Sequence, residues 1–331
     1  MTAKLAMGRT EWTLLIILSV LWGGSFFFAK IALAEIPPLT LVLLRVSIAA
    51  SALYLFLRIT GRVLPKSASL WGMFAMMGLL NNLIPFCLLF WGQTHIGAGL
   101  ASIFNALAPV FTVIVAHVFL TDEKLTFGKG IGVICGLLGV AVLIGLDMSK
   151  GLGLWTILAM TGCLIAALAY GFASVYGRRF GERRIDPFTV AFGQLACTTV
   201  MMIPVAFLTE APLGIGVPST GSIAAVLMLA LASTALGYVI FFRILARGGA
   251  TNISLVAFLI PVSAILLSAL FLGERLSANH VAGMGMIFLG LSALDGRLWH
   301  SISKSLSKWN SAYDLPRHLK HIDRASNART D

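Results

Sequence analysis

Charged residues are scarce in this sequence. Asp, Glu, Lys and Arg make up only 11% of its 331 residues, and 58% are hydrophobic, whereas soluble globular chains average about 25% charged and about 45–50% apolar residues. A water-soluble domain of this length needs more charge to cover its surface. The composition therefore indicates an integral membrane protein that crosses the bilayer several times.

Acidic side chains are absent from the middle of every apolar run. All thirteen lie at run ends, in connections or in the tail: Glu11, Glu35, Asp122, Glu123, Asp147, Glu182, Asp186, Glu210, Glu274, Asp295, Asp314, Asp323 and Asp331. Membrane-embedded enzymes need paired carboxylates, a metal, or a nucleophile with its base, and no residues at one depth have those spacings. A Walker-type phosphate loop is missing as well. These absences argue against an enzyme and against nucleotide hydrolysis.

Cysteine is also rare. The four cysteines all lie inside apolar runs, without a CxxC pair or a Cys/His cluster: Cys87, Cys135, Cys163 and Cys197. Isolated cysteines of this kind act as small apolar packing residues. We expect no disulfide framework, no metal site and no cofactor.

Long apolar runs, in contrast, fill almost the whole chain. A bilayer core of about 30 Å requires about 20 apolar residues per helical span. Ten windows meet this length: 12–34, 39–57, 70–92, 97–120, 128–146, 152–176, 187–208, 222–246, 250–272 and 277–294. The sequence predicts an all-α membrane protein with ten transmembrane helices.

The second half of the chain repeats the first. Pro109 returns as Pro261 at an offset of 152 residues, and Glu123 returns as Glu274 at an offset of 151. Matches that keep one register indicate a duplicated unit. We predict a five-helix repeat over residues 12–146, a second one over 152–294, and a polar, basic tail over 295–331. Because five spans is an odd number, the second repeat must enter the membrane in the inverted orientation.

The net charge of +11 follows this topology. With the N-terminus in the cytoplasm, four of the 24 basic residues fall outside or toward the outer half, namely Lys30, Arg45, Lys150 and Arg275. This bias satisfies the positive-inside rule and predicts that both termini are cytoplasmic. The basic excess is thus a topology signal and a contact for the lipid bilayer, and no basic patch interleaved with aromatic residues points to nucleic acid.

Polar and aromatic side chains at mid-depth are the candidate site. They are Trp22, Arg45, Asn81, Asn82, Asn105, Tyr170, Gln194, Ser233, Thr234 and Tyr238. Amide and hydroxyl groups inside a membrane must face other helices or a wet cavity. They therefore either line a shared cavity or join helices in pairs, and adjacent asparagines on a helix point about 100° apart, so we expect only one of Asn81 and Asn82 to line a cavity.

Arg45 has two interpretations. An arginine at the bilayer centre costs about 2.5–3.5 kcal/mol on insertion scales, and Arg45 lies roughly 9 Å from the outer end of its span at 1.5 Å per residue. It could therefore extend to the membrane surface. It could equally face an anion, since no acidic residue lies at comparable depth to pair with it.

Glycines form a stripe on the fifth span, at positions 128, 132, 136 and 139, and positions 283 and 290 retain part of it in the tenth. Small residues at this spacing let helices approach closely. The stripe predicts either internal packing or a homodimer seam through the fifth and tenth helices.

Taken together, these features resemble a known family. The sequence is similar to the drug/metabolite transporter superfamily, and specifically to EamA-type exporters. The resemblance rests on Trp22-Gly23-Gly24 followed by Phe26, the Leu43-Leu44-Arg45 triplet, the mid-span prolines with acidic turns and the glycine-rich fifth helices. The resemblance implies two inverted five-helix repeats in the cell (inner) membrane around a central cavity lined by the first four helices of each half. It also implies export of amino acids, aromatic ones in the best-known relatives, or of related metabolites.

The resemblance sets the expected mechanism. Inverted repeats support alternating access around a midplane site, with Pro109 and Pro261 as hinges and Glu123 and Glu274 as helix-end gate residues. Proton relays usually need a buried acid or histidine, and His117 near a helix end is the one candidate close to the core, so we expect facilitated transport and leave coupled antiport open. The alternatives are a membrane-embedded enzyme, or a lipid-handling or assembly protein without a solute path.

Overall fold

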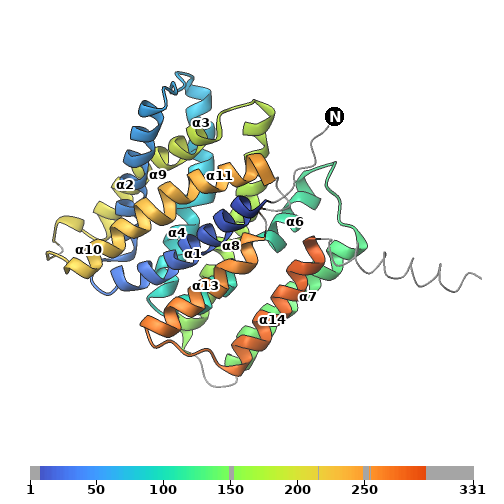
Figure 1. Cartoon of the computed structure of the whole chain (residues 1–331). Coiled ribbons are helices and arrows are strands. Elements are labelled where there is room, and N and C mark those ends of the chain that lie inside the picture. The colour runs from blue at the N-terminus through green and yellow to red at the C-terminus, as the bar shows by residue number, and fades with distance from the viewer. Residues whose placement is uncertain (1–7, 149–152, 215, 249–252, 254, 296–331) are drawn as a thin grey trace, which may run out of the picture.

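The computed structural model describes residues 8–295 except for 149–152, 215, 249–252 and 254. Within this part the chain is helical and contains no strand (Figure 1). Seven helical stretches are long and apolar enough to cross a membrane, and three shorter apolar helices cover residues Phe127–Leu143, Val256–Phe271 and Ala278–Leu294. The protein is therefore a multi-pass membrane protein, while the inverted ten-helix arrangement stays a prediction. The predicted tail over 295–331 lies outside the described residues, except for residue 295.

The first half contains seven α-helices and one π-helical segment. They are α1 (Arg9–Ala32), α2 (Pro38–Ile59), α3 (Ala68–Gly78), η1 (Leu79–Leu83), α4 (Ile84–Gln93), α5 (Ala98–Asn105), α6 (Ala108–Phe119) and α7 (Phe127–Met148). Helices α3, η1 and α4 run on without a break as the predicted third span. The predicted fourth span is interrupted between α5 and α6, directly before Pro109, because a proline cannot donate a backbone hydrogen bond to the preceding turn.

The second half follows the same plan. Its elements are α8 (Leu154–Glu182), α9 (Pro187–Thr209), η2 (Pro212–Gly214, a 3₁₀ turn), α10 (Thr220–Leu227), η3 (Met228–Leu236), α11 (Gly237–Gly248), α13 (Val256–Phe271) and α14 (Ala278–Asp295). Segment η3 is again π-helical, and it lies inside the eighth predicted span as η1 lies inside the third. Helix α8 continues six residues beyond the predicted end at 176 and includes the basic residues Arg178 and Arg179.

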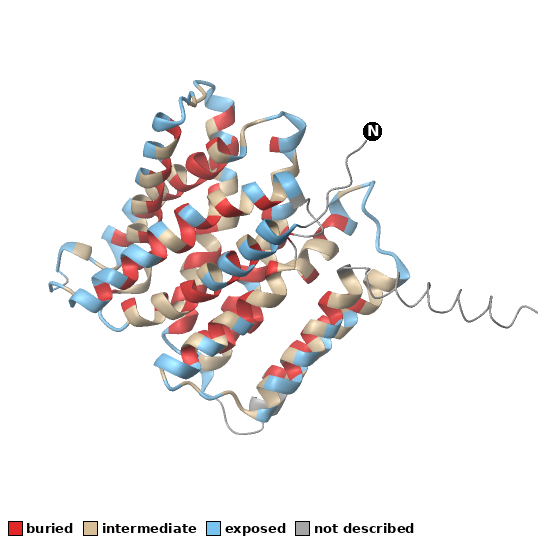
Figure 2. Cartoon of the chain, in the orientation of Figure 1, coloured by how far each residue is buried: buried red, intermediate tan, exposed pale blue. Residues whose placement is uncertain are grey.

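Contacts between helices come in related pairs. Helix α1 of the first half packs against α13 of the second, and α8 of the second half packs against α6 of the first. In the same way, α8 packs against α4, and α1 packs against α10, η3 and α11. Helices α2 and α9 contact each other directly, and α2 also contacts η3 as α9 contacts η1. Buried residues lie along the inward faces of these helices (Figure 2). The polar stretches of both halves are thereby brought to the middle of one bundle.

Helices α7 and α14 form a separate antiparallel pair beside this bundle (Figure 1). Their glycines touch one another: a Cβ added to Gly132 would lie 2.7 Å from the Gly290 carbonyl oxygen, and one added to Gly139 would lie 2.8 Å from that of Gly283. The glycine stripe is thus filled by a contact within one chain. A homodimer through these two helices, which stays a prediction, would have to use their other faces.

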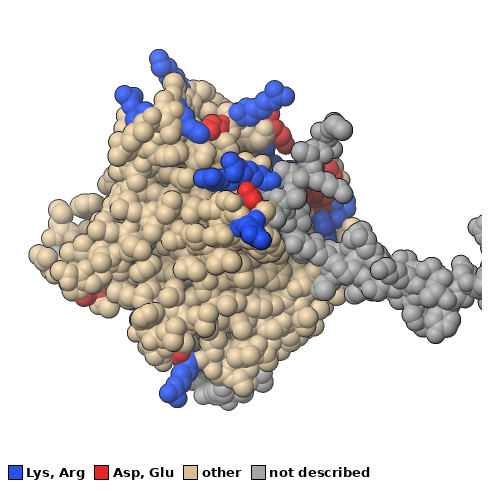
Figure 3. Space-filling view, viewed as in Figure 1, with Lys and Arg blue, Asp and Glu red and all other residues tan. Residues whose placement is uncertain are grey.

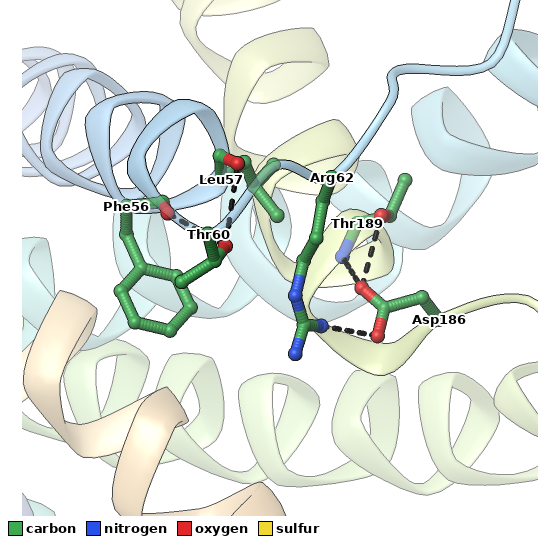
Figure 4. Close-up of polar contacts among 6 residues, drawn as sticks. All are labelled: Phe56, Leu57, Thr60, Arg62, Asp186 and Thr189. Carbon is green, nitrogen blue, oxygen red and sulfur yellow. Dashed lines mark hydrogen bonds and ion pairs between the residues drawn. The ribbon is translucent and has the colours of Figure 1, made fainter.

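Different polar contacts join the helices at the two ends of the bundle. The end where α1 begins, here called the Arg62 end, carries most of the Lys and Arg side chains on the face shown in Figure 3. There Arg62 forms an ion pair with Asp186, whose other carboxylate oxygen accepts hydrogen bonds from the Thr189 N–H and hydroxyl, both at 3.0 Å (Figure 4). Arg178 pairs with Asp122 and Glu123 at the same end.

At the opposite end, here called the Glu274 end, carboxylates from one half bind the N-termini of helices in the other half. Glu210 accepts hydrogen bonds from the N–H groups of Leu39 and Thr40 at the start of α2, at 3.0 and 2.7 Å. Glu35 accepts bonds from the N–H and hydroxyl of Ser219 before α10, both at 2.6 Å. These bonds hold the pKa of the exposed Glu35 carboxyl below its ordinary value. The free N–H groups at a helix start make it a favourable partner for a carboxylate.

Candidate functional site

Arg45 lies inside the bundle and not at the membrane surface. It is 7% exposed, its Nε donates a hydrogen bond to the Thr234 hydroxyl at 2.9 Å, and its guanidinium carbon lies 3.8 Å from the centre of the Phe86 ring. Within the described residues the Nε bond is the only hydrogen bond of this guanidinium. Its two Nη groups therefore keep their donors available.

The π-helical winding of η3 leaves the Thr234 hydroxyl oxygen free to accept a hydrogen bond. The Thr234 hydroxyl donates its single hydrogen to the carbonyl oxygen of Leu229, five residues earlier, at 2.8 Å. Its oxygen lone pairs are then left for Arg45. Single-turn π-helical insertions often occur at functional sites, and here the insertion orients a hydroxyl toward the buried cation.

An amide and hydroxyl network extends across the two halves. Asn81 Nδ2 donates to Gln194 Oε1 at 3.0 Å and to the Tyr238 hydroxyl at 3.1 Å. The Tyr238 hydroxyl donates to Asn82 Oδ1 at 3.4 Å, and Asn82 Nδ2 lies 3.5 Å from the Thr198 hydroxyl. Asn81 and Asn82 thus belong to one network, in which Asn82 is fully buried and Asn81 is partly exposed. That only one of them lines a cavity stays a prediction.

A glycine allows the two halves to meet at this network. A Cβ added to Gly78 would lie 2.6 Å from both the Gln194 carbonyl oxygen and the Thr198 hydroxyl oxygen. Any side chain at this position would push the start of η1 away from α9. Gly78 therefore sets the approach that brings Asn81 and Asn82 within hydrogen-bonding distance of the second half.

Aromatic rings surround the polar groups. Phe90 is a second ring near the Arg45 guanidinium, with its centre 5.6 Å from the guanidinium carbon, and the Trp22 and Phe241 ring centres are 5.4 Å apart. Tyr170, on α8, is partly buried and packs against the hydrophobic core of the bundle. The Trp22 indole nitrogen would lie 2.7 Å from a Cβ at Gly237, the residue before Tyr238. Trp22 thus approaches the same centre.

Two predicted residues each have a buried polar atom without a hydrogen bond. The buried Oδ1 of Asn105 and the buried Oγ of Ser233 have no hydrogen-bond partner in the described part of the chain. Asn105 ends α5, and Ser233 precedes Thr234 in η3. Both atoms remain available as acceptors. A shallow hollow of about 340 Å³ between α2 and α9 is lined by none of the predicted residues, but by Ser47, Ala50, Ser51, Tyr54, Phe192, Ala196 and Thr199.

Sequence reasoning missed two kinds of residue at this site. Thr198 lies one helical turn after Gln194, and Phe86 lies one turn after Asn82, so the helical period alone could have added both. Lys30 and Gln93 were missed because their role depends on the packing of helix ends. In the residues that the structure describes, no group of three His, Cys, Asp or Glu side chains could hold a metal ion.

Glu274 and Lys30 join helices at the Glu274 end of the bundle. Glu274 accepts hydrogen bonds from the N–H groups of Ala98 and Gly99 at the start of α5, at 2.9 and 3.1 Å. Lys30, from α1, donates to the carbonyl oxygens of Gln93, at the end of α4, and Ile96, just after it, at 2.5 and 3.0 Å. We call this set of contacts the Glu274 latch. It joins α1, the α4–α5 connection and the α13–α14 turn.

The repeat partners of the latch residues are placed differently. Glu123 is half-exposed and pairs with Arg178 at 3.2 Å. Arg178 also binds Asp122 at 2.5 Å, and this hydrogen bond holds the pKa of Asp122 below its ordinary value. Pro109 lies at the beginning of α6 after the interruption of the fourth span, whereas Pro261 lies inside α13. The paired prolines therefore have different local structures.

Apolar helices around a buried polar centre, with helix ends that lock across two halves, define a membrane protein of the transporter class. The comparisons with known proteins give the family. The EamA-like transporter family model matches residues 10–145 and again residues 155–294, so the chain belongs to that family, within the drug/metabolite transporter superfamily. Family membership makes it a transporter and excludes the enzyme alternative.

Individual relatives agree with this family. The chain is 27% identical over 281 residues to the uncharacterized transporter YoaV of Bacillus subtilis, which covers 84% of this chain and 94% of the relative. It is 26% identical over 298 residues to a probable amino-acid metabolite efflux pump of Salmonella typhimurium, covering 86% and 94% respectively. A crystal structure with 20% identity superposes with a TM-score of 0.62, covering 87% of this chain and 98% of the other, and shows the same fold.

Proposed function

We propose that the protein exports amino acids or related small metabolites by alternating access through a site between its two halves. The observation that carries this proposal is the network in which Asn81 of the first half binds Gln194 and Tyr238 of the second. A group that belongs to both halves can be exposed to one side of the membrane and then to the other when the halves move. An assembly protein without a solute path would instead have scattered these residues into separate pairs.

We further propose the inverted ten-helix arrangement for this motion. Its support is the double match of the family model and the way helix contacts come in related pairs, such as α1 with α13 and α6 with α8. The basic side chains at the Arg62 end support a cytoplasmic location of that end in the cell (inner) membrane, with both termini inside. The Glu274 latch then closes the outer side.

The relative described as a probable amino-acid metabolite efflux pump supports the substrate class. Arg45 is the residue we assign to the substrate carboxylate, because a guanidinium binds a carboxylate with two parallel hydrogen bonds and its Nη groups are free among the described residues. The aromatic rings near it suit an apolar side chain. Uncoupled transport fits the finding that, among the described residues, no acidic side chain bonds to this centre.

Flux through proteoliposomes tests this function. A panel of labelled amino acids, purines and sugars in uptake and counterflow assays identifies the transported class. In the site, Tyr238→Phe removes only the hydroxyl that joins Asn81 to Asn82, and we expect a loss of about tenfold in flux because buried hydrogen-bond partners are left unpaired.

The matched control is Tyr54→Phe, since Tyr54 is 43% exposed on the surface of α2 and lies outside the network. It should leave the flux unchanged. Equal flux in wild type and Tyr238→Phe, together with unchanged flux in Asn105→Leu, would show that the cavity is elsewhere. Transport of sugars or purines only would refute the amino-acid class.

A further inference from the structure

The Arg45 guanidinium offers the free charged donors at the site. Within the described residues, its Nη1 and Nη2 donate no hydrogen bond, whereas the Oδ1 atoms of Asn81 and Asn105 and the Oγ of Ser233 accept none. A ligand that satisfies these groups must offer acceptors on one end. A carboxylate, with two oxygens in one plane, fits the edge of the guanidinium.

The charge at the site is unbalanced. Arg45 is a buried cation, and no described carboxylate forms an ion pair or hydrogen bond with it or with the network. A monoanion would neutralise the site. A zwitterionic amino acid would bring its ammonium group as well, and this group would find amide and hydroxyl oxygens but no carboxylate partner. Buried charges without a partner are strongly unfavourable.

The rings restrict how a ligand can approach Arg45. Phe86 covers one face of the guanidinium at 3.8 Å, so a carboxylate can bind only along the edge that carries the Nη groups. Phe90, Trp22 and Phe241 add apolar surface nearby. The remainder of the ligand should therefore be apolar or aromatic.

We propose that the site selects small monocarboxylates that carry a net charge of −1, with an apolar or aromatic body and an amino group that is absent or acylated. This inference rests on the proposed transport function and narrows its substrate class from free amino acids and related metabolites to those related metabolites that lack a free ammonium group. It also gives export a driving force without a proton relay. An inside-negative potential of 100 mV favours the outside location of a monoanion by about 50-fold.

Three ligands with the same body test the charge rule: N-acetylphenylalanine (−1), phenylalanine (zwitterion) and phenylalanine amide (+1). With the full chain in proteoliposomes, we expect the flux of N-acetylphenylalanine to exceed that of phenylalanine amide by at least about tenfold, with phenylalanine between them. A potassium diffusion potential should change the flux of N-acetylphenylalanine and leave that of phenylalanine unaffected. A phenylalanine flux equal to or above that of its N-acetyl derivative overturns the proposal.

Variants at Arg45 provide the second arm. Arg45→Gln should lower N-acetylphenylalanine flux by about tenfold or more, and Arg45→Lys should restore part of it because it keeps the charge but not the planar fork. Arg58→Gln, the same change at an exposed position of the same helix, should stay within about twofold of wild type. Gel-filtration profile and Tm show whether each variant is folded.

A binding measurement separates this inference from the proposed function. If none of the three ligands is transported, export of this class is refuted. The charge rule is then decided by heat stabilisation in detergent: N-acetylphenylalanine should raise Tm in wild type but not in Arg45→Gln. If phenylalanine is transported and N-acetylphenylalanine neither moves nor stabilises, the function stands and the charge rule fails.

Discussion

Replacing Glu274 with glutamine is a direct perturbation of the Glu274 latch. In the wild type, the two carboxylate oxygens accept hydrogen bonds from the N–H groups of Ala98 and Gly99 at the start of α5. Glutamine keeps one of these oxygens as an acceptor but loses the second acceptor and the negative charge. A hydrogen bond to a charged group contributes about 1.5–3 kcal/mol, and a charge at a helix N-terminus about 0.3–1 kcal/mol. Because one neutral hydrogen bond remains, we expect the latch to weaken by about 2 kcal/mol.

This loss predicts a change in access from the Glu274 end. At about 1.4 kcal/mol per tenfold change, the ratio of closed to open forms should fall by about 30-fold. A cysteine at position 105, in a background without the four native cysteines, reports on opening. A membrane-impermeant maleimide added at the outer face should label Asn105→Cys up to about 30 times faster in the Glu274→Gln variant.

The repeat supplies the control. Glu123→Gln makes the same change at the equivalent turn, where the carboxylate pairs with Arg178 at a solvent-exposed position. An exposed ion pair contributes about 0–1 kcal/mol, so labelling from outside should change by less than about fivefold. If Glu274→Gln leaves the labelling rate within twofold of the parent, the Glu274 contact is a structural cap and not a latch.

Three further predictions concern packing and pH. Gly78→Val should separate η1 from α9, break the Asn82–Thr198 contact and cost about 1–3 kcal/mol, seen as a lower Tm together with reduced flux; retained flux would contradict the role of this approach. Gly139→Leu should lower Tm by disrupting the α7–α14 pair without altering the molar mass by light scattering, whereas a drop from dimer to monomer would place a dimer seam there. Since hydrogen bonding to Arg178 lowers the folded-state pKa of Asp122, its stabilisation is present above the unfolded pKa of about 3.9 and is lost as pH falls through the lowered value. The Tm of wild type should therefore fall more between pH 5 and pH 3 than that of Asp122→Asn, and parallel curves would show that the pair does not stabilise the fold.

The amino-acid sequence by itself determined the class of this protein and the composition of its centre. Scarce charge and long apolar runs dictate membrane-spanning helices, because backbone groups in lipid must be bonded within their own segment. The same solvent makes every polar residue at mid-depth informative, and six of them, Arg45, Asn81, Asn82, Gln194, Thr234 and Tyr238, meet in hydrogen bonds across the two halves. Their mid-depth positions in the predicted spans were enough to select them.

Only the tertiary structure decided how these residues are used. Whether Arg45 reaches the membrane surface or an interior partner depends on Thr234, which is 189 residues away, and on a π-helical turn that no periodic pattern indicates. The Glu274 latch likewise depends on a helix start 175 or 176 residues distant. Glycine spacing left both internal packing and a dimer seam open, because close approach is a property of two surfaces together. Local sequence determines which polar groups each helix carries, and the packing of the two halves determines which of these groups remain free to bind a ligand.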